Sequence, residues 1–246
     1  SFNLLADDNN KRINTILSEL QKKTYKKGTI EQKLSDFYKL ALNVDARNKA
    51  GISPVKPLLD EMEAAKTKAD LQKIQLKYAA QGYGVSFGGG FGADEKNVKM
   101  NIFNLGQGGL TLGQKDYYVN NDTATVAIRE AFKKYVQKMF QLYGFSAEEA
   151  AQKEQAIFQH ETMLALISKS MTELRDPQAN YNKMTLKEFQ EKYPNLNLEA
   201  MCNAEGIKSE YIQEMIVGQP DFLAGLDKIT AAENDNTLRA LMEWDV

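Results

Sequence analysis

Leu110-Thr-Leu-Gly-Gln-Lys-Asp-Tyr-Tyr118 opens the stretch of sequence that decides the fold, and the stretch closes on Tyr181-Asn-Lys-Met184. Between these two ends lie two segments whose apolar residues recur at helical spacing. Ser146-Ala-Glu-Glu149 is a capping-box sequence between the two segments, shortly after the stop signal Gly144. The stretch therefore predicts two long consecutive helices.

The rest of the chain predicts shorter helices and a small amount of β structure. Amphipathic segments follow one another from residue 4 to residue 78, joined by short turns. Tyr83–Phe87 and Val98–Phe103 are rich in strand-forming residues and flank the glycine-rich segment Gly88–Asn97, which predicts a hairpin with a wide loop whose glycines serve the turn. Residues 211–217 resemble a further strand. We expect a mainly α fold with a small β-hairpin or short antiparallel sheet, in a single helical domain over residues 1–246, because no linker-like composition interrupts the chain.

The bulk composition excludes some classes of partner. The 246 residues carry 31 basic and 33 acidic side chains, and no clustered basic face of the kind that binds nucleic acid is evident. No apolar run approaches the roughly 18 residues of a membrane span, so we expect no membrane contact in this segment. Ser1-Phe-Asn3 resembles the middle of a protein, and Leu238–Val246 is a helical pattern without a stop signal, so both ends are expected to be cut.

His160-Glu161 is the one place where the sequence approaches a metal site. A zinc-protease helix needs a second histidine four residues after the first, and that position holds Leu164. His160 is the only histidine of the chain. We therefore interpret His160-Glu161 as the polar side of a helix whose apolar side is Phe158, Leu164 and Ile167, and expect no catalytic residue and no metal ligand in this chain.

Arg175-Asp176 and Tyr181-Asn182 form a polar cluster between predicted helices. A satisfied polar network that ties helices together at a corner is the main interpretation, and direct contact with a substrate is the alternative.

Taken in order, several motifs resemble those of the neprilysin-type zinc endopeptidases, the M13 family, which includes bacterial oligopeptidases called PepO. The resemblance covers essentially the whole chain and is carried by Phe2-Asn-Leu-Leu5, Phe37-Tyr38, Arg47, Gly51, Pro54, Pro57-Leu-Leu59, Gly109–Tyr118, Glu161–Ala165, Arg175-Asp176, Tyr181–Leu186 and Leu241-Met-Glu-Trp244. Within Gly109–Tyr118, the family's proline and arginine are replaced in this chain.

The resemblance implies that the zinc motif lies far downstream, in a catalytic domain that is absent here. This chain would then be the non-catalytic helical lid that limits the size of substrates, inactive alone, with no cofactor of its own. Its partners would be the zinc-bearing catalytic domain of the same polypeptide and oligopeptide substrates. Asp116, Tyr117 and Tyr118 would be structural, as would Arg175, Asp176, Tyr181 and Asn182.

The resemblance also implies substrate contacts around Phe2 and Asn3. Asn3 stands where the family often has aspartate, and Ala6 where it has arginine. Recognition of a substrate's terminal carboxylate is therefore in doubt for this chain. An extracytoplasmic location (secreted, periplasmic or lipid-anchored) is expected from the resemblance only.

Two other functions are compatible with the same helices. One is a stand-alone helical peptide-binding or scaffold module, and the other is an independent hydrolase that uses carboxylates. A downstream H-E-x-x-H motif in the full reading frame would favour the lid, and turnover that survives a chelator would favour the carboxylate hydrolase.

Overall fold

The computed structural model describes residues 2–79, 81–83 and 86–246. The chain forms two compact units, Ser1–Pro54 and Val55–Val246. The expectation of a single domain over residues 1–246 stays a prediction.

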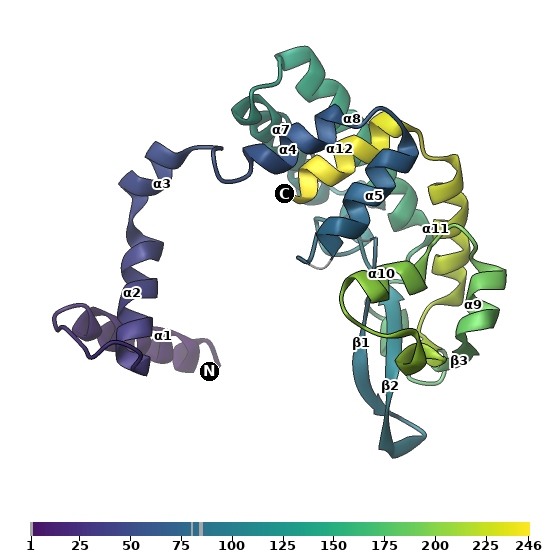
Figure 1. The fold of residues 1–246 in the computed structure, drawn as a ribbon, viewed down its shortest axis with the longest axis horizontal. Helices are drawn as coiled ribbons and strands as arrows, with labels where there is room; N and C mark the ends of the chain where they lie inside the picture. The colour runs from purple at the N-terminus through teal and green to yellow at the C-terminus, as the bar shows by residue number, and fades with distance from the viewer. Residues whose placement is uncertain (1, 80, 84–85) are drawn as a thin grey trace. The chain divides into compact units, whose positions relative to one another are not determined.

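The first unit consists of three helices with almost no buried surface. They are α1 (Phe2–Leu20), α2 (Ile30–Leu42) and α3 (Val44–Ala50), and α1 packs across one end of α2 (Figure 1). Thr29 caps α2 by accepting the amide hydrogen of Gln32, and Asn43 caps α3. The only buried residue of these helices is Ser35. Most of their large apolar side chains are exposed, namely Phe2, Leu4, Leu5, Ile13, Ile16, Ile30, Leu34, Phe37, Leu40, Leu42 and Val44, whereas Leu17 and Leu20 are partly buried.

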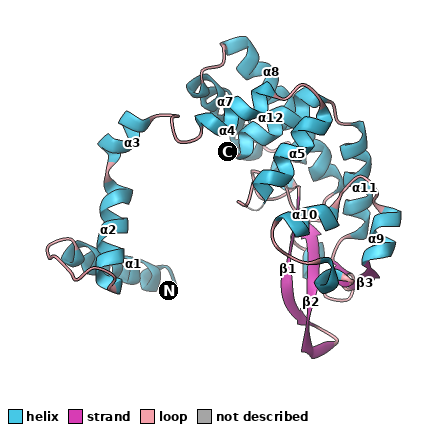
Figure 2. Ribbon diagram, viewed as in Figure 1, coloured by secondary structure: helices cyan, strands magenta, loops and turns pink. Residues whose placement is uncertain are grey.

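The second unit holds the remaining helices and all the strands (Figure 2). Its α-helices are α4 (Lys56–Ala64), α5 (Lys68–Ala79), α6 (Asp116–Val119), α7 (Thr123–Tyr143), α8 (Ala147–Ile167), α9 (Leu186–Lys192), α10 (Leu198–Ala204), α11 (Pro220–Ala232) and α12 (Asp235–Asp245). The 3-10 helices η1 (Glu173–Arg175) and η2 (Ser209–Ile212) complete it. The mainly α fold predicted from the sequence is confirmed.

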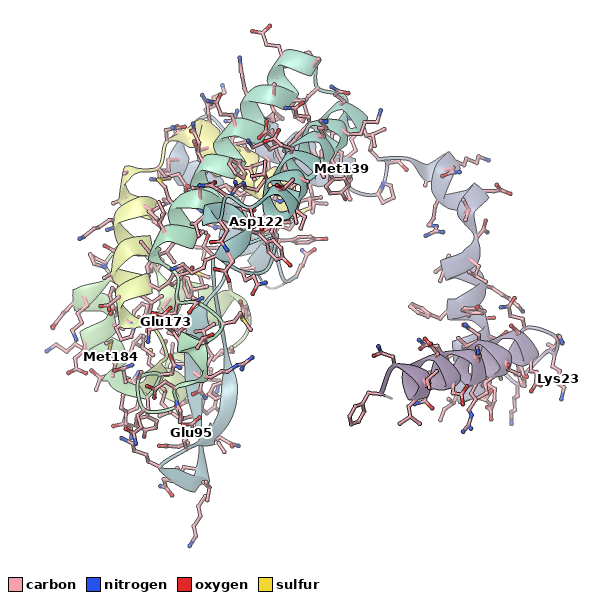
Figure 3. The ribbon with its side chains drawn as sticks, turned by 180° about the vertical axis from the view of Figure 1, so that it is seen from behind. Lys23, Glu95, Asp122, Met139, Glu173 and Met184 are labelled. Carbon is pink, nitrogen blue, oxygen red and sulfur yellow. The ribbon has the colours of Figure 1, made fainter. Side chains whose placement is uncertain are left out.

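Of the two long helices of the opening stretch, the first ends and the second begins where the sequence predicts. Asp122 lies at the start of α7 (Figure 3) and accepts the amide hydrogen of Thr125. Gly144 ends the helix in the left-handed conformation, with φ 107°, which costs glycine little. The capping box of Ser146 and Glu149 is formed at the start of α8, with each side chain bonded to the other residue's backbone.

The strands form one four-stranded sheet in the order β1-β2-β4-β3. The strands are β1 (Phe87–Asp94), β2 (Asn97–Gln107), β3 (Asn182–Thr185) and β4 (Glu214–Val217). β1 and β2 form the predicted antiparallel hairpin, but β4 runs parallel to β2 and antiparallel to β3. The sheet is therefore mixed and not wholly antiparallel. The sequence carries no signal for the parallel pairing of β4 with β2, which joins residues as far apart as Phe103 and Met215.

The wide hairpin loop predicted over Gly88–Asn97 is wrong. Most of that segment is β1 itself, and the chain turns tightly at Glu95 and Lys96 (Figure 3). A Cβ atom on Gly89 would lie 2.7 Å from the ring of Phe103, so the cross-strand side chain occupies the space that any other residue would need. Gly84 and Val85, which fall in the predicted first strand, lie outside the described residues.

Three apolar clusters stabilise the second unit, and α12 contributes to two of them. The largest lies between the sheet and α9, α10 and α11. A second joins α4 and α5 to Leu238 and Met242 of α12, and a third joins α7 and α8 to Ala240 of α12. Because α12 is shared, it fixes the helices at this end of the unit relative to one another (Figure 1).

Candidate functional site

A buried polar network surrounds Glu161, in the middle of α8. Tyr118 of α6 donates its hydroxyl hydrogen to Glu161 Oε2. The hydroxyl of Thr111 donates to Oε1 at 2.6 Å, and the amide of Thr111 donates to Oε2 at 3.3 Å. Glu161 is only 3% exposed, so these three donors replace the water that the carboxylate loses.

Two further donors extend the network to other parts of the chain. The indole Nε1 of Trp244, on α12, donates to Thr111 Oγ1 at 3.0 Å. The amide of Leu112 donates to the Tyr118 hydroxyl at 3.0 Å. The loop before α6, the middle of α8 and the end of α12 are thus joined through one carboxylate.

The electrostatics fit a structural role for this network. Burial, and then the neighbouring carboxylate of Glu161, raise the pKa of Tyr118 well above its usual range, so the hydroxyl keeps its proton and donates. Burial also raises the pKa of Glu161, while the hydrogen bonds from Thr111 and Tyr118 oppose that rise. The three hydrogen bonds that Glu161 accepts hold its carboxylate against α6 and the loop before α6.

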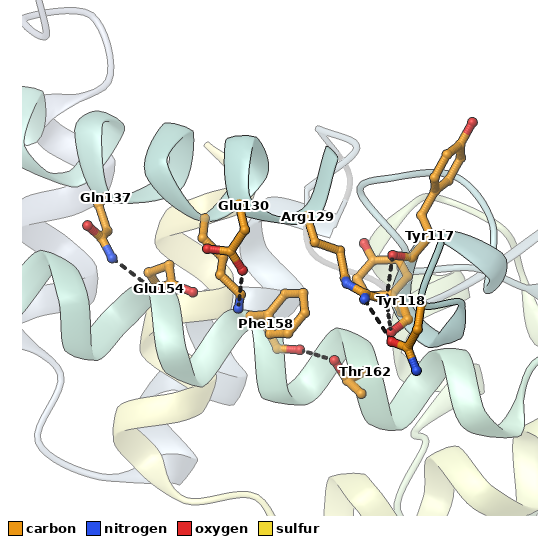
Figure 4. A network of polar contacts seen from close by, with 10 residues as sticks. Tyr117, Tyr118, Arg129, Glu130, Gln137, Glu154, Phe158 and Thr162 are labelled. Carbon is orange, nitrogen blue, oxygen red and sulfur yellow. Dashed lines mark hydrogen bonds and ion pairs between the residues drawn. The ribbon is translucent and has the colours of Figure 1, made fainter. Parts of the chain in front are cut away.

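The predicted motif residues Asp116, Tyr117 and Tyr118 all lie on α6, which α7 holds in place. The guanidinium of Arg129 donates to the carbonyl oxygen of Tyr118 at 2.8 Å and more weakly to that of Tyr117 (Figure 4). Arg129 also donates to the side chain of Asn121. No hydrogen bond or ion pair is found for the Asp116 side chain within the described residues.

His160 is not a residue of a solvated helix face, and that interpretation is wrong. The residue is 4% exposed, and its Nδ1 lies 2.9 Å from Oε1 of Glu233, at the end of α11. The distance suits an ion pair, but the alignment falls short of a hydrogen bond, and Nε2 has no partner among the described residues. The sequence suggested a surface because the burying elements come from positions far along the chain.

A cavity of about 390 Å³ opens beside the Glu161 network and the pair of His160 and Glu233. Its polar lining includes His160, Glu161 and Glu233, together with Lys68, whose ammonium group donates to the carbonyl oxygens of Thr230 and Glu233. Its apolar lining includes Phe87, Leu110, Leu226, Leu238, Leu241, Met242 and Trp244. The lining is therefore mixed, with polar and apolar residues in similar numbers, and the cavity is large enough to hold part of a ligand or of another polypeptide segment.

The second predicted polar cluster lies against the sheet. Tyr181 donates its hydroxyl hydrogen to Asp94 Oδ1 at 2.8 Å, at the end of β1. Asn182 donates to the carbonyl oxygen of Val217 on β4, and Asp176 accepts the amides of Gln178 and Ala179 in a local turn.

The predicted residues are therefore only partly brought together. No hydrogen bond or ion pair is found for the Arg175 side chain in the described part of the chain. Nor does any such contact join the cluster of Asp176, Tyr181 and Asn182 to Tyr118, as far as residues 2–79, 81–83 and 86–246 extend.

Phe2 and Asn3, the predicted substrate contacts, lie in the first turn of α1 in the first unit. Both are exposed, and Phe2 is 91% exposed. In the part of the chain that the structure describes, no hydrogen bond is found for the Asn3 side chain. Their role in substrate binding stays a prediction.

Among the described residues, no group of three or more histidine, cysteine, aspartate or glutamate side chains is arranged to hold a metal ion. None of the described helices is long and apolar enough to cross a membrane.

The sequence did not identify several residues of the polar network. Thr111, Glu233 and Trp244 lie 50, 73 and 133 positions from their partners Glu161, His160 and Thr111. The one available signal was the adjacent polar pair His160 and Glu161 within a long predicted helix, and that signal names none of the distant partners.

The protein-family sequence model described as "Peptidase family M13" matches residues 1–246 of this chain. Neprilysin-3 of Drosophila melanogaster is 25% identical over 237 residues, which are 89% of this chain and 30% of that protein. The endothelin-converting enzyme homolog of Locusta migratoria is 31% identical over 163 residues, 65% of this chain and 22% of that protein. The chain thus spans less than a third of the length of these relatives.

Solved structures show the same fold. The zinc metalloprotease Zmp1 of Mycobacterium tuberculosis, in complex with an inhibitor, superposes with a TM-score of 0.87 at 23% identity over 99% of this chain and 37% of its own. PepO from Lactobacillus rhamnosis superposes with a TM-score of 0.76 at 20% identity over 98% of this chain and 38% of its own.

Proposed function

The chain belongs to peptidase family M13, and from that premise we propose that it is the non-catalytic lid of a zinc metalloendopeptidase that cleaves oligopeptides. The single observation that carries the proposal is a family match over all 246 residues in a chain with only one histidine. A protease helix that binds zinc through two histidines has no place in such a sequence. The zinc and its ligands would belong to the remainder of the polypeptide, where zinc would activate water for attack on the peptide bond.

The first unit supports a partner within the same polypeptide. Its helices have amphipathic sequences, yet Phe2, Phe37 and Leu40 are 91%, 72% and 67% exposed. Large exposed apolar patches mark surfaces that bind another protein or segment. The catalytic domain of the same polypeptide is the proposed occupant, and the helices would then form a wall that excludes large folded substrates. An extracytoplasmic location accompanies this proposal, on the strength of the family likeness alone.

The catalytic test compares this chain with the full polypeptide on an internally quenched peptide of about ten residues. The 246-residue chain is expected to give no turnover and to retain no stoichiometric zinc after dialysis. The full polypeptide is expected to cleave the peptide, to lose activity with a chelator, and to leave a folded protein substrate intact. Chelator-sensitive cleavage by the 246-residue chain alone would contradict the proposal, and chelator-resistant cleavage would favour a carboxylate hydrolase.

The exposed apolar residues of the first unit are the proposed docking surface for the catalytic domain, and Phe37→Asn tests this surface directly. In the isolated chain the substitution should change the free energy of unfolding by less than about 0.5 kcal/mol, because the side chain is already exposed. In the full polypeptide it should cost about 1–3 kcal/mol, because Phe37 would there be buried against the catalytic domain. Thermal and urea unfolding of both forms measure the difference.

Lys39→Asn, two positions along α2 and also exposed, is the matched control and should have a small effect in both forms. Equal effects of Phe37→Asn in the isolated chain and the full polypeptide would argue against the docking surface.

A peptide-binding module is the second candidate, and the cavity beside His160 and Glu161 favours it. Calorimetric titration of the isolated chain with a mixture of oligopeptides distinguishes the two. Micromolar binding that Leu241→Trp abolishes by filling the cavity would support a module, whereas no binding is expected of a lid.

A further inference from the structure

Glu63, Lys153 and Glu243 meet where α4, α8 and α12 come together. Lys153 Nζ lies 2.6 Å from Glu243 Oε2 and 3.3 Å from Glu63 Oε1. The side chain of Glu243 is 0% exposed, that of Lys153 is 16% exposed and that of Glu63 is 44% exposed. One ammonium group therefore faces two carboxyl groups at the edge of the interior.

The oxygen of Glu243 that does not contact Lys153 bears on how the carboxyl groups of Glu63 and Glu243 can lie next to each other. Glu243 Oε1 is buried and receives no hydrogen from any donor among the described residues. The carboxyl group of Glu63 lies beside it, because both carboxyl groups contact the ammonium group of Lys153. Two carboxylates have only acceptor atoms, so a direct hydrogen bond between them forms only when one of them carries a proton.

Arg239 and Tyr143 also lie near the carboxyl groups of Glu63 and Glu243. Arg239 of α12 acts on Glu63 through its charge and donates to the carbonyl oxygen of Ala65, just after α4. Tyr143 of α7 is near enough for Glu243 to contribute to raising its pKa, after burial and Tyr135.

Two more charged side chains, Glu61 and Lys153, have partners of their own beside Glu63 and Glu243. Glu61, also on α4, is bonded to Lys77 and Tyr78 of α5 and forms a separate pair. Lys153 also lies over the ring of Phe145, at 4.3 Å from its centroid, so its ammonium group is fixed in position.

We propose that Glu63, Lys153 and Glu243 form a proton-dependent clasp that holds α4 against α8 and α12. With a proton on Glu243, its carboxyl group donates to Glu63 and accepts from Lys153, and all three helices are tied together. Loss of that proton leaves two carboxylates in contact around one cation, and the attachment of α4 weakens. The clasp makes the packing of α4 responsive to pH.

The direction of the effect follows from the pKa values. Burial, and then the contact with Glu63, raise the pKa of Glu243 from 4.5 to about 8. For Glu63 burial acts upward, but the contact with Glu243 and the charge of Lys153 outweigh it and lower the pKa. Between pH 4.5 and about 8 the folded chain keeps a proton on Glu243 that the unfolded chain has lost. Stability contributed by the clasp is thus present at pH 4.5 and is lost as the pH rises to about 8.

Glu243→Gln tests the clasp, because glutamine copies the protonated side chain and cannot lose a proton. The urea midpoint of the unsubstituted chain should fall as the pH rises from 5 to 9, and that of the Glu243→Gln chain should stay nearly level over the same range. The two midpoints should agree at pH 5, and the glutamine variant should be the more stable at pH 9. An ordinary ion pair between Lys153 and Glu243 predicts the reverse order at pH 9, and that result would overturn the clasp.

Two further measurements keep the test decisive. Glu61→Gln, on the same helix but outside the clasp, should retain the full pH dependence, whereas Glu63→Gln should reduce it. Amide exchange of residues 56–64, corrected for the intrinsic rate, should rise about tenfold from pH 6 to pH 7, where opening releases the proton of Glu243, and should not rise in Glu243→Gln. Equal exchange in the two chains would also contradict the proposal.

Discussion

Replacing Phe140 with alanine is expected to lower the free energy of unfolding by about 3–5 kcal/mol. The side chain is fully buried on α7. Its ring packs edge to face with Tyr143 and Phe145, with centroids 5.9 and 5.8 Å away, and lies 6.4 Å from Trp244 of α12. Alanine would remove these contacts and leave a cavity where three helices meet, and the rigid helices around it can close that cavity only in part. Urea unfolding followed by circular dichroism measures the loss.

Leu142→Ala is the control for that substitution. Leu142 is on the same helix but 55% exposed, so its loss should cost less than about 1 kcal/mol. Phe140→Leu, which keeps most of the volume, should fall between the two. If Phe140→Ala and Leu142→Ala were equally destabilising, the interior position of Phe140 would be wrong.

The sequence predicted features that depend on neighbouring residues. Helix α8 begins at the predicted capping box of Ser146 and Glu149. Such boxes are formed by residues three positions apart, so the pattern and the structure concern the same few atoms. Gly144 ends α7 for an equally local reason.

The sequence failed where a distant element decides the outcome. Gly89 was expected in a loop, but it lies in β1. Phe103, on the neighbouring strand, fills the space that a side chain at this position would need. His160 was expected on a polar surface, but it is buried against Glu233 from α11. Neither partner can be identified from the residues adjacent in sequence.

The apolar faces of the first unit are a different kind of case. Periodicity correctly predicted helices around Ile13 and Phe37, because amphipathic spacing specifies a helix. It also implied a core, yet Ile13 is 52% exposed and Phe37 is 72% exposed. An amphipathic pattern establishes that a face will be covered without specifying by what, and for this unit the proposed cover is the catalytic domain of the same polypeptide.

Replacing Glu161 with alanine is the second substitution with a large expected effect, about 3 kcal/mol of unfolding free energy. The alanine would remove a carboxylate that accepts hydrogen bonds from the Tyr118 hydroxyl and from two groups of Thr111. Each buried donor left without a partner costs about 1–3 kcal/mol. Gln159→Ala, an exposed position on the same helix, should be nearly neutral. Urea unfolding at pH 7 compares the two.

A double-mutant cycle with Tyr118→Phe separates the network from simple loss of volume. Tyr118→Phe alone removes one donor to Glu161 and leaves the amide of Leu112 without its acceptor, and should cost about 1–2 kcal/mol. Once Tyr118 is phenylalanine, Glu161→Ala strands fewer donors, so the double variant should be more stable than the sum of the two losses by about 1 kcal/mol. Strict additivity would mean that the two side chains act independently. In that case the loop before α6 and the middle of α8 would be held by apolar packing alone, and the carboxylate of Glu161 would need another reason to be buried.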